Sequence, residues 1–187
     1  MSQGIAHASP PTLTGEELLS LGGLGPCELI DGRIVPMSPT GGTHARIESA
    51  LGVELTLFVR QAQLGWVLVG EVGIYTRRNP DRVRGADLAF LSRKRAPAGP
   101  PKGFLDRAPE LVVEIASPGD RWEEMQQKIE EYFACGVDQV WVIEPENRAL
   151  RAYNSALEAR RFAAGEILYG EGSLAGFALA VDTLFDE

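Results

Sequence analysis

The chain has 187 residues, a net charge of −8 and 44% hydrophobic residues, which is the composition of an ordinary globular domain. Its two cysteines and two histidines are too few for a Cys/His zinc site, so oxygen atoms must supply most ligands of any bound metal. No apolar run reaches the roughly 18 residues that a membrane span requires, and no signal-peptide pattern opens the sequence. We therefore expect a cytoplasmic protein without a membrane partner, folded as one domain over residues 1–187 with residues 1–11 flexible.

The first third of the chain predicts two helices with a hairpin between them. Thr14 and Glu17 have the spacing of a capping box and predict a helix over residues 13–21. Residues 27–39 form two extended pieces around an Asp-Gly pair, the strongest hairpin signal in the chain. Thr43 is expected to cap the next helix, which runs to about residue 63. Its apolar residues are spaced to form one stripe: Ile47, Leu51, Leu55 and Phe58.

The middle of the chain predicts strands separated by loops. Residues 66–76 are typical of two strands or one bent strand, with glycines at the bend. Another strand is predicted over residues 86–92 and a further one over residues 110–117. The proline- and glycine-rich segment 96–103 between them is expected to be a surface loop.

The last third predicts a βαβ unit. Asp120 is expected to cap a helix that ends at Gly136, and residues 138–145 are typical of a central strand. The strands before and after this helix should be parallel, with a right-handed crossover. The helix should bury four apolar residues: Trp122, Met125, Ile129 and Phe133. Three elements follow: an antiparallel strand at 149–155, a hairpin near 161–168 and a strand near 177–181. The pattern indicates an α/β domain with a mixed sheet.

One carboxylate stands in the middle of the predicted strand 110–117. Alternation places Glu114 on a face with Val112 and Ala116, and both faces of this strand are largely apolar. An ionised carboxylate there is costly unless it is paired, hydrogen-bonded or bound to a metal. An arginine would satisfy it, but Asp87 begins another apolar strand, and on neighbouring strands the two carboxylates would converge. Two converging carboxylates bind Mg²⁺ or Mn²⁺.

Lys128 lies at the border of the buried stripe of the predicted helix. Counted at 100° per residue, its side chain can reach inward toward the sheet. It can equally pair with Glu124 and Glu131 on the outer surface of the helix. Helical geometry alone leaves both arrangements open.

Basic side chains are concentrated in residues 77–107. This segment holds nine basic and three acidic residues, a net charge of +6, so the rest of the chain carries −14. It is either a solvated loop region in an acidic protein or a patch that contacts the phosphates of a nucleic acid. Four arginines are the candidates for that contact: Arg77, Arg78, Arg82 and Arg84.

Five motifs are spread over most of the chain: 27-CELIDGRIVPMSPTGGTHARI-47, 85-GADLAFL-91, 109-PELVVEIASPGDR-121, Lys128 and 132-YFACGVDQVWVIEP-145. In their order and spacing they resemble one known family, Uma2, also called DUF820. The resemblance implies a nuclease of the PD-(D/E)XK restriction-endonuclease-like fold, with a mixed central sheet flanked by helices.

The resemblance also implies roles for individual residues. Asp87 and Glu114 would be the metal-binding acids, and Lys128 would orient or polarise the attacking water. The wider fold places that lysine two residues after the glutamate, where this chain has Ala116. Lys128 fits a lysine that has moved to the following helix. Ala86 stands where the family usually has a proline, a change that affects backbone stiffness rather than metal binding.

Three further residues are possible accessory members of the site. His44 and Glu48 share one face near the start of the long helix, from which this fold often takes an extra acid. His44 can also be a packing or capping residue. Glu71, beside a glycine in the predicted strand 66–76, is a third candidate.

The sequence therefore predicts a Mg²⁺- or Mn²⁺-dependent endodeoxyribonuclease that hydrolyses the phosphodiester bonds of DNA. By analogy with endonucleases that cut both strands, it should act as a homodimer. The alternative is a non-catalytic nucleic-acid-binding or regulatory protein that keeps the nuclease fold without useful turnover. Overall acidity and the lack of a separate DNA-reading domain favour that alternative.

Overall fold

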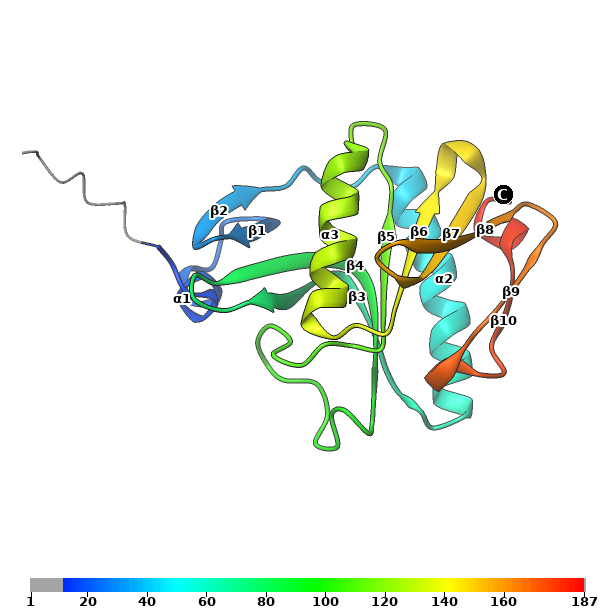
Figure 1. Cartoon of the computed structure of the whole chain (residues 1–187), viewed down its shortest axis with the longest axis horizontal. Helices are drawn as coiled ribbons and strands as arrows, with labels where there is room; N and C mark the ends of the chain where they lie inside the picture. The colour runs from blue at the N-terminus through cyan, green and yellow to red at the C-terminus, as the bar shows by residue number, and fades with distance from the viewer. Residues whose placement is uncertain (1–11, 187) are drawn as a thin grey trace, which may run out of the picture.

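The structure, a computed structural model, describes residues 12–186 and is built around one eight-stranded sheet (Figure 1). The strand order is β2-β1-β4-β5-β6-β7-β8, and β3 pairs with β4 beside this path. The predicted flexibility of residues 1–11 lies outside the described residues. The strands of the sheet are β1 (Cys27–Ile30), β2 (Arg33–Pro36), β3 (Gly65–Arg77), β4 (Arg82–Ser92), β5 (Leu111–Ile115), β6 (Gln139–Glu144), β7 (Ala149–Ser155) and β8 (Glu158–Ala163).

The described residues also form a small second sheet and several helices. The second sheet pairs β9 (Ile167–Tyr169) with β10 (Ala178–Ala180). The α-helices are α1 (Gly15–Leu21), α2 (Gly42–Gln61) and α3 (Trp122–Cys135). Short 3₁₀ turns are η1 (Pro145–Asn147), η2 (Gly172–Leu174) and η3 (Val181–Leu184). No helix within residues 12–186 is long and apolar enough to cross a membrane.

The predicted mixed sheet and its βαβ unit are confirmed. β5 and β6 are parallel, with α3 as the crossover between them, whereas the other ladders of the large sheet are antiparallel. The predicted return of residues 149–155 is β7, antiparallel to β6. The predicted hairpin at 27–39 is confirmed as β1 and β2, whose turn places Asp31 and Gly32 at φ 54° and 73°.

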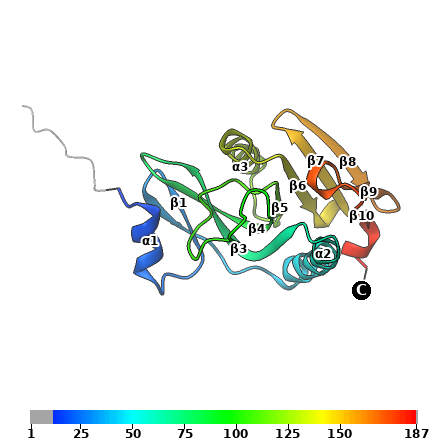
Figure 2. The same ribbon diagram turned by 90° about the horizontal axis from the view of Figure 1, so that it is seen from below.

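The two long helices cover opposite faces of the sheet (Figure 2). On the α2 side the core includes Leu51 and Leu55 of the helix with Leu111 and Val113 of β5. On the α3 side it includes Ile129 with Val112. Alternation along β5 was therefore predicted correctly, and β5 is buried on both faces. A carboxylate on this strand can reach water only through a gap at the end of the sheet.

The buried face of α3 differs from the predicted stripe. Met125 and Ile129 are buried as expected, but Tyr132 is fully buried and Trp122 is 46% exposed. The predicted cap is also wrong, because the Asp120 carboxylate accepts a hydrogen bond from Ser117 N at 2.8 Å and closes the preceding turn. The N-cap residue is Arg121, which makes no side-chain cap. Gly136 ends the helix as predicted, at φ 103°.

Other boundaries were predicted with mixed success. The capping box of Thr14 and Glu17 is confirmed. The N-cap of α2 is Gly41, so Thr43 lies inside the first turn and does not cap it. β4 starts at Arg82, four residues earlier than predicted, because the basic residues before Ala86 also pair with β3. The hairpin predicted near 161–168 is wrong, since β8 pairs with β7 while β9 pairs with β10.

β3 is one strand with a bulge. Its register with β4 shifts between Val69 and Val72, so two residues, Gly70 and Glu71, lie between the paired positions. Both have positive φ, 86° and 54°. Gly70 adopts this conformation without strain, but a glutamate does so rarely. The bulge is therefore a local departure that the surrounding structure must stabilise.

The corrected face of α3 gives a prediction for stability. Ile129→Ala should lower the free energy of unfolding by about 2–5 kcal/mol because it empties a fully buried position. Trp122→Ala removes a larger side chain but should cost less than about 1 kcal/mol, because that side chain is half exposed. Urea unfolding of both variants measures the difference. A larger loss of stability for Trp122→Ala than for Ile129→Ala would contradict the exposed position of Trp122 and the buried position of Ile129.

Candidate active site

A cavity of about 830 Å³ opens where α2, β3, β4, β5 and α3 come together. Its walls bring together five of the residues singled out in the sequence: His44, Glu71, Asp87, Glu114 and Lys128. They come from five different elements, so only the folded sheet with both helices in place assembles them. Residues 117–121, between β5 and α3, form part of its rim.

Asp87 is fixed at the base of this cavity by β5 and α2. It precedes Leu88, which pairs with Val113 of β5, and its side chain is 8% exposed. One carboxylate oxygen, Oδ2, accepts a hydrogen bond from Ile115 N at 2.6 Å. The other, Oδ1, lies 3.0 Å from His44 Nε2. Both oxygens therefore have a defined direction before any ligand arrives.

His44 is tied to Asp87 rather than to the helix end. Its Nδ1 lies 3.4 Å from Ser117 Oγ, on the loop after β5. The hydrogen bond to Asp87 raises the pKa of His44 above its usual value, although burial opposes the shift. The histidine thus links the start of α2 to the β4 carboxylate and to the loop. Its part in chemistry stays a prediction.

Glu114 and Lys128 form a buried ion pair. Lys128 Nζ lies 2.8 Å from Glu114 Oε2, and the Glu114 side chain is 6% exposed. Tyr132 donates its hydroxyl to the other oxygen, Oε1, at 2.6 Å. Burial raises the pKa of Glu114 to about 7, and the positive charge of Lys128 limits the rise. Burial lowers the pKa of Lys128, but Glu114, Glu28 and Asp87 together outweigh this and raise the pKa overall, so the lysine is cationic.

Lys128 points inward, which decides between the two arrangements that helical geometry left open. Besides Glu114, it donates to the backbone oxygen of Gly85 at 3.1 Å, and Glu28 Oε1 lies 3.5 Å away. Glu131, its expected surface partner, instead binds Arg82 and Arg84. The lysine is therefore available to the cavity, between β4 and β5.

Two supporting residues were missed in the sequence. Tyr132 lies one helical turn after Lys128, and this i, i+4 spacing was the signal that both meet Glu114. Glu28 accepts hydrogen bonds from Gly85 N at 3.0 Å and Arg84 at 2.8 Å. No local sequence pattern marks Glu28, because its partners are 56 and 57 residues away.

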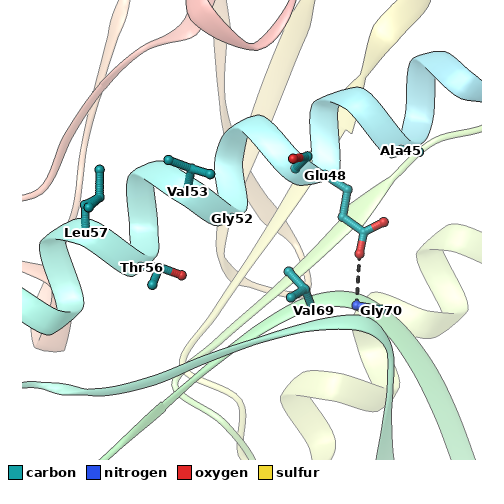
Figure 3. A pocket seen from close by; sticks show the side chains of 9 residues that line it. Ala45, Glu48, Gly52, Val53, Thr56, Leu57, Val69 and Gly70 are labelled. Atoms are coloured by element: carbon teal, nitrogen blue, oxygen red, sulfur yellow. Dashed lines mark hydrogen bonds between the residues drawn. The ribbon is translucent and has the colours of Figure 1, made fainter.

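Glu48 and Glu71 occupy different places. Glu48 lies beside a separate groove of about 630 Å³ between α2 and β3, and its Oε1 accepts a hydrogen bond from Gly70 N at 2.9 Å (Figure 3). Glu71 lines the main cavity. Burial raises the pKa of Glu71, and the negative charge of Asp87 adds to this. The two acids are neighbours in space but face different openings.

The four arginines predicted to bind nucleic acid are all ion-paired. Arg82 and Arg84 are nearly buried, with side chains 11% and 10% exposed, and they share Glu131. Arg77 pairs with Asp31, and Arg78 pairs with Glu16 and Asp81, but both side chains are nearly half exposed. Contact with nucleic acid stays a prediction for all four. The exposed pair, Arg77 and Arg78, can make it with less disruption of the fold.

The cavity has the donor chemistry of a Mg²⁺ or Mn²⁺ site. These ions prefer carboxylate oxygens, and Asp87, Glu114 and Glu71 supply them from three adjacent strands. Within residues 12–186, no group of three or more His, Cys, Asp or Glu side chains is already arranged to hold an ion. Binding must therefore draw side chains together. Glu71 Oε2 is buried and has no hydrogen-bond partner within residues 12–186, so this oxygen is available to coordinate a cation.

Comparisons with known proteins relate this chain to one protein family. The model of the Uma2 family, described as "Putative restriction endonuclease", matches residues 16–182. A solved structure from Anabaena variabilis ATCC 29413, "a putative nuclease belonging to DUF820", has a TM-score of 0.77 and 21% sequence identity. The alignment covers 92% of this chain and 97% of that chain, and at this identity it shows the fold alone. No curated protein matches the sequence.

The ion pair between Glu114 and Lys128 gives a prediction that a double-mutant cycle can check. Lys128→Met should lower the free energy of unfolding at pH 8 by about 3–5 kcal/mol, because it leaves a buried carboxylate without its cation. Adding Glu114→Gln should recover most of that loss, with a coupling energy of about 2–3 kcal/mol in urea unfolding. Independent, additive losses would contradict the pairing.

Lys128→Met should also change how stability depends on pH. Glu114 already has its pKa raised to about 7, and without Lys128 it should rise further. A folded-state pKa above the unfolded value means that the folded protein holds the extra proton between the two values. Stability should therefore rise as pH falls from 9 to 5, and in Lys128→Met the rise should begin at higher pH than in the unmodified protein.

Proposed function

The chain belongs to the Uma2 family, and from this premise we propose that it is a divalent-metal-dependent endonuclease that hydrolyses phosphodiester bonds of DNA. One observation carries the proposal: Asp87, Glu114 and Lys128 line the same cavity although they come from β4, β5 and α3. Two acids can hold a divalent metal ion that promotes phosphodiester hydrolysis, and a cationic lysine can offset the charge that develops on the phosphate. A cytoplasmic location and a homodimer belong to the proposal as predictions.

In this proposal Asp87 and Glu114 hold Mg²⁺ or Mn²⁺, and a bound ion supplies positive charge beside the scissile phosphate and makes water more acidic. His44 and Ile115 N hold the Asp87 carboxylate in place. That fixed orientation limits the rearrangement needed during reaction. The neighbouring negative charges of Asp87, Glu114 and Glu71 in one cavity favour the binding of a cation.

Lys128 is proposed to position the attacking water and to offset the charge that develops on the phosphate. Its ammonium group makes two short contacts, with Glu114 and the Gly85 carbonyl. The remaining contact, to Glu28 Oε1, is longer at 3.5 Å. One donor hydrogen is therefore weakly engaged and can be directed to a water molecule. The cationic form needed for this role is maintained by Glu114.

The pairing of the basic residues supports a second function, a non-catalytic nucleic-acid-binding or regulatory protein. The chain is acidic overall, and Arg82 and Arg84, two of the four arginines predicted to contact a substrate strand, are already paired with Glu131. Affinity for Mn²⁺ separates the two functions. A protein that binds DNA but no Mn²⁺, alone or with DNA, would have the second function.

Substitution of the acids tests the nuclease. Asp87→Asn and Glu114→Gln should each lower Mg²⁺- or Mn²⁺-dependent nicking of plasmid DNA by at least about 100-fold, because they remove the negative charge that would hold the ion beside the phosphate. Both changes keep the size of the side chain, and circular dichroism should show an unchanged fold. Equal nicking by the unmodified protein and both variants would mean that another nuclease in the preparation is responsible.

The exposed arginines test substrate binding. Replacing Arg77 and Arg78 together by alanine should weaken DNA binding. It should also reduce the slope of log affinity against log salt concentration by up to about 2, one for each phosphate contact that is lost. Arg84→Ala should mainly lower stability, because it removes the nearly buried cation that pairs with both Glu28 and Glu131. Fluorescence anisotropy at several salt concentrations measures the first effect and urea unfolding the second. Unchanged affinity in the double variant would place the DNA elsewhere.

A further inference from the structure

We propose that Glu71 supplies the third carboxylate of the metal site, and that the bulge in β3, rather than helix α2, delivers it. The inference rests on the proposed metal-dependent function. It assigns to this chain a different source for the extra acid than the helix from which the fold often takes one.

The bulge turns Glu71 into the cavity. In a regular ladder, residues alternate between faces, and an extra residue changes which side chain points to a given face. Here the extra residue lies between Val69 and Val72, and Glu71 lines the same cavity as Asp87. Its backbone has φ 54°, a conformation that costs a non-glycine residue of order 1–3 kcal/mol and that clusters at functional sites.

Glu48 is committed to holding that bulge. Its Oε1 accepts the Gly70 N–H at 2.9 Å, so this carboxylate satisfies the backbone group that the bulge removes from the ladder (Figure 3). Glu48 also lines the groove between α2 and β3 instead of the cavity that holds Asp87. The helix acid thus acts on the position of Glu71 and does not itself reach the site.

Of Asp87, Glu114 and Glu71, Glu71 is the acid that can move to a cation without losing a hydrogen bond. Asp87 and Glu114 each have both oxygens engaged. Glu71 Oε2 is the buried side-chain oxygen that has no partner within residues 12–186. The nearby His44 and Lys128 act on Glu71 only through their charge, because His44 makes its hydrogen bond to Asp87 and Lys128 makes its hydrogen bond to Glu114. An unpaired buried carboxylate is unfavourable unless a cation joins it.

Gly85 leaves the space that this carboxylate occupies. A Cβ at position 85 would lie 2.9 Å from Glu71 Oε2 and 3.7 Å from Met37 Sδ. The backbone of Gly85 meanwhile accepts from Lys128 and donates to Glu28. The missing side chain therefore lets Glu71 approach β4 beside the lysine and the two other acids. A hard divalent cation is the ligand that such a set of oxygens selects.

Calorimetric titration with Mn²⁺ alone tests the assignment without relying on activity. Glu71→Gln should weaken Mn²⁺ binding by about 10-fold or more, while Asp87→Asn should abolish it. Glu158→Gln is the matched control, because it makes the same chemical change at an exposed position of β8 and should leave affinity unchanged. Glu48→Gln should have a smaller effect than Glu71→Gln, because its amide oxygen can still accept from Gly70 N.

Each outcome decides something. Mn²⁺ binding by Glu71→Gln that equals the unmodified protein, with binding lost in Asp87→Asn, would overturn the role of Glu71 and leave the proposed nuclease intact. A greater loss in Glu48→Gln than in Glu71→Gln would make the helix acid the ligand. An unmodified protein without Mn²⁺ affinity, free or with DNA, would overturn both the metal site and the role of Glu71.

Stability separates metal binding from a structural role. Without metal, Glu71→Gln should unfold at the same or a higher urea concentration, because it removes a buried charge that has no partner. A parallel loss of stability and affinity would show that Glu71 supports the fold, which would overturn the assignment. Gly85→Ala should weaken Mn²⁺ binding by displacing the carboxylate, but it should have little further effect once Glu71→Gln is present. Additive losses in that pair would contradict the proposed contact.

Discussion

The burial of one carboxylate on the central strand sets the arrangement of everything around it. Glu114 lies on β5, which is covered on both faces, and it is stable there because Lys128 and Tyr132 reach it from one helix. That requirement fixes the rotation of α3 about its axis, with Lys128 and Tyr132 inward and Trp122 outward. It also fixes β4, because the lysine binds the Gly85 carbonyl as well. One ion pair therefore joins β4, β5 and α3 at the edge of the cavity.

The charges next to this pair form a continuous network. Glu28 lies between Lys128 and Arg84, and Arg84 in turn shares Glu131 with Arg82. Residues 77–107 carry a net charge of +6, and part of that charge is thus neutralised inside the protein by acids that lie far away in the sequence. The network gives these arginines a structural role that is independent of nucleic acid. It also holds Glu28, and through it Gly85, beside the lysine.

The sequence was informative where local periodicity decides the structure and uninformative where distant partners do. Alternation placed Glu114 on the correct face, because the face depends only on nearby residues. The approach of Asp87 could be predicted only on condition that its strand was a neighbour, and the pairing of β4 with β5 meets that condition. The rotation of α3 was only half predicted: helical spacing puts Trp122 and Tyr132 at opposite borders of one stripe, and the partner Glu114 selects between them. Charge counts could not reveal that Arg82 and Arg84 are paired, since Glu131 is 49 and 47 residues away. The bulge at Glu71 had only one sign in the sequence, the adjacent glycine.

The site combines groups that are held firmly with one that is left free, and this division has a physical basis. Asp87 and Glu114 have their oxygens satisfied by protein donors, so the protein itself defines their positions. Glu71 sits on strained backbone, and its inner oxygen lacks any donor within the described residues, so the folded chain carries a cost at this position. Functional sites commonly keep such costs when a ligand relieves them. Of Asp87, Glu114 and Glu71, the unsatisfied Glu71 is therefore the most informative about what the protein binds, because the cation proposed above would supply the partner that its inner oxygen lacks.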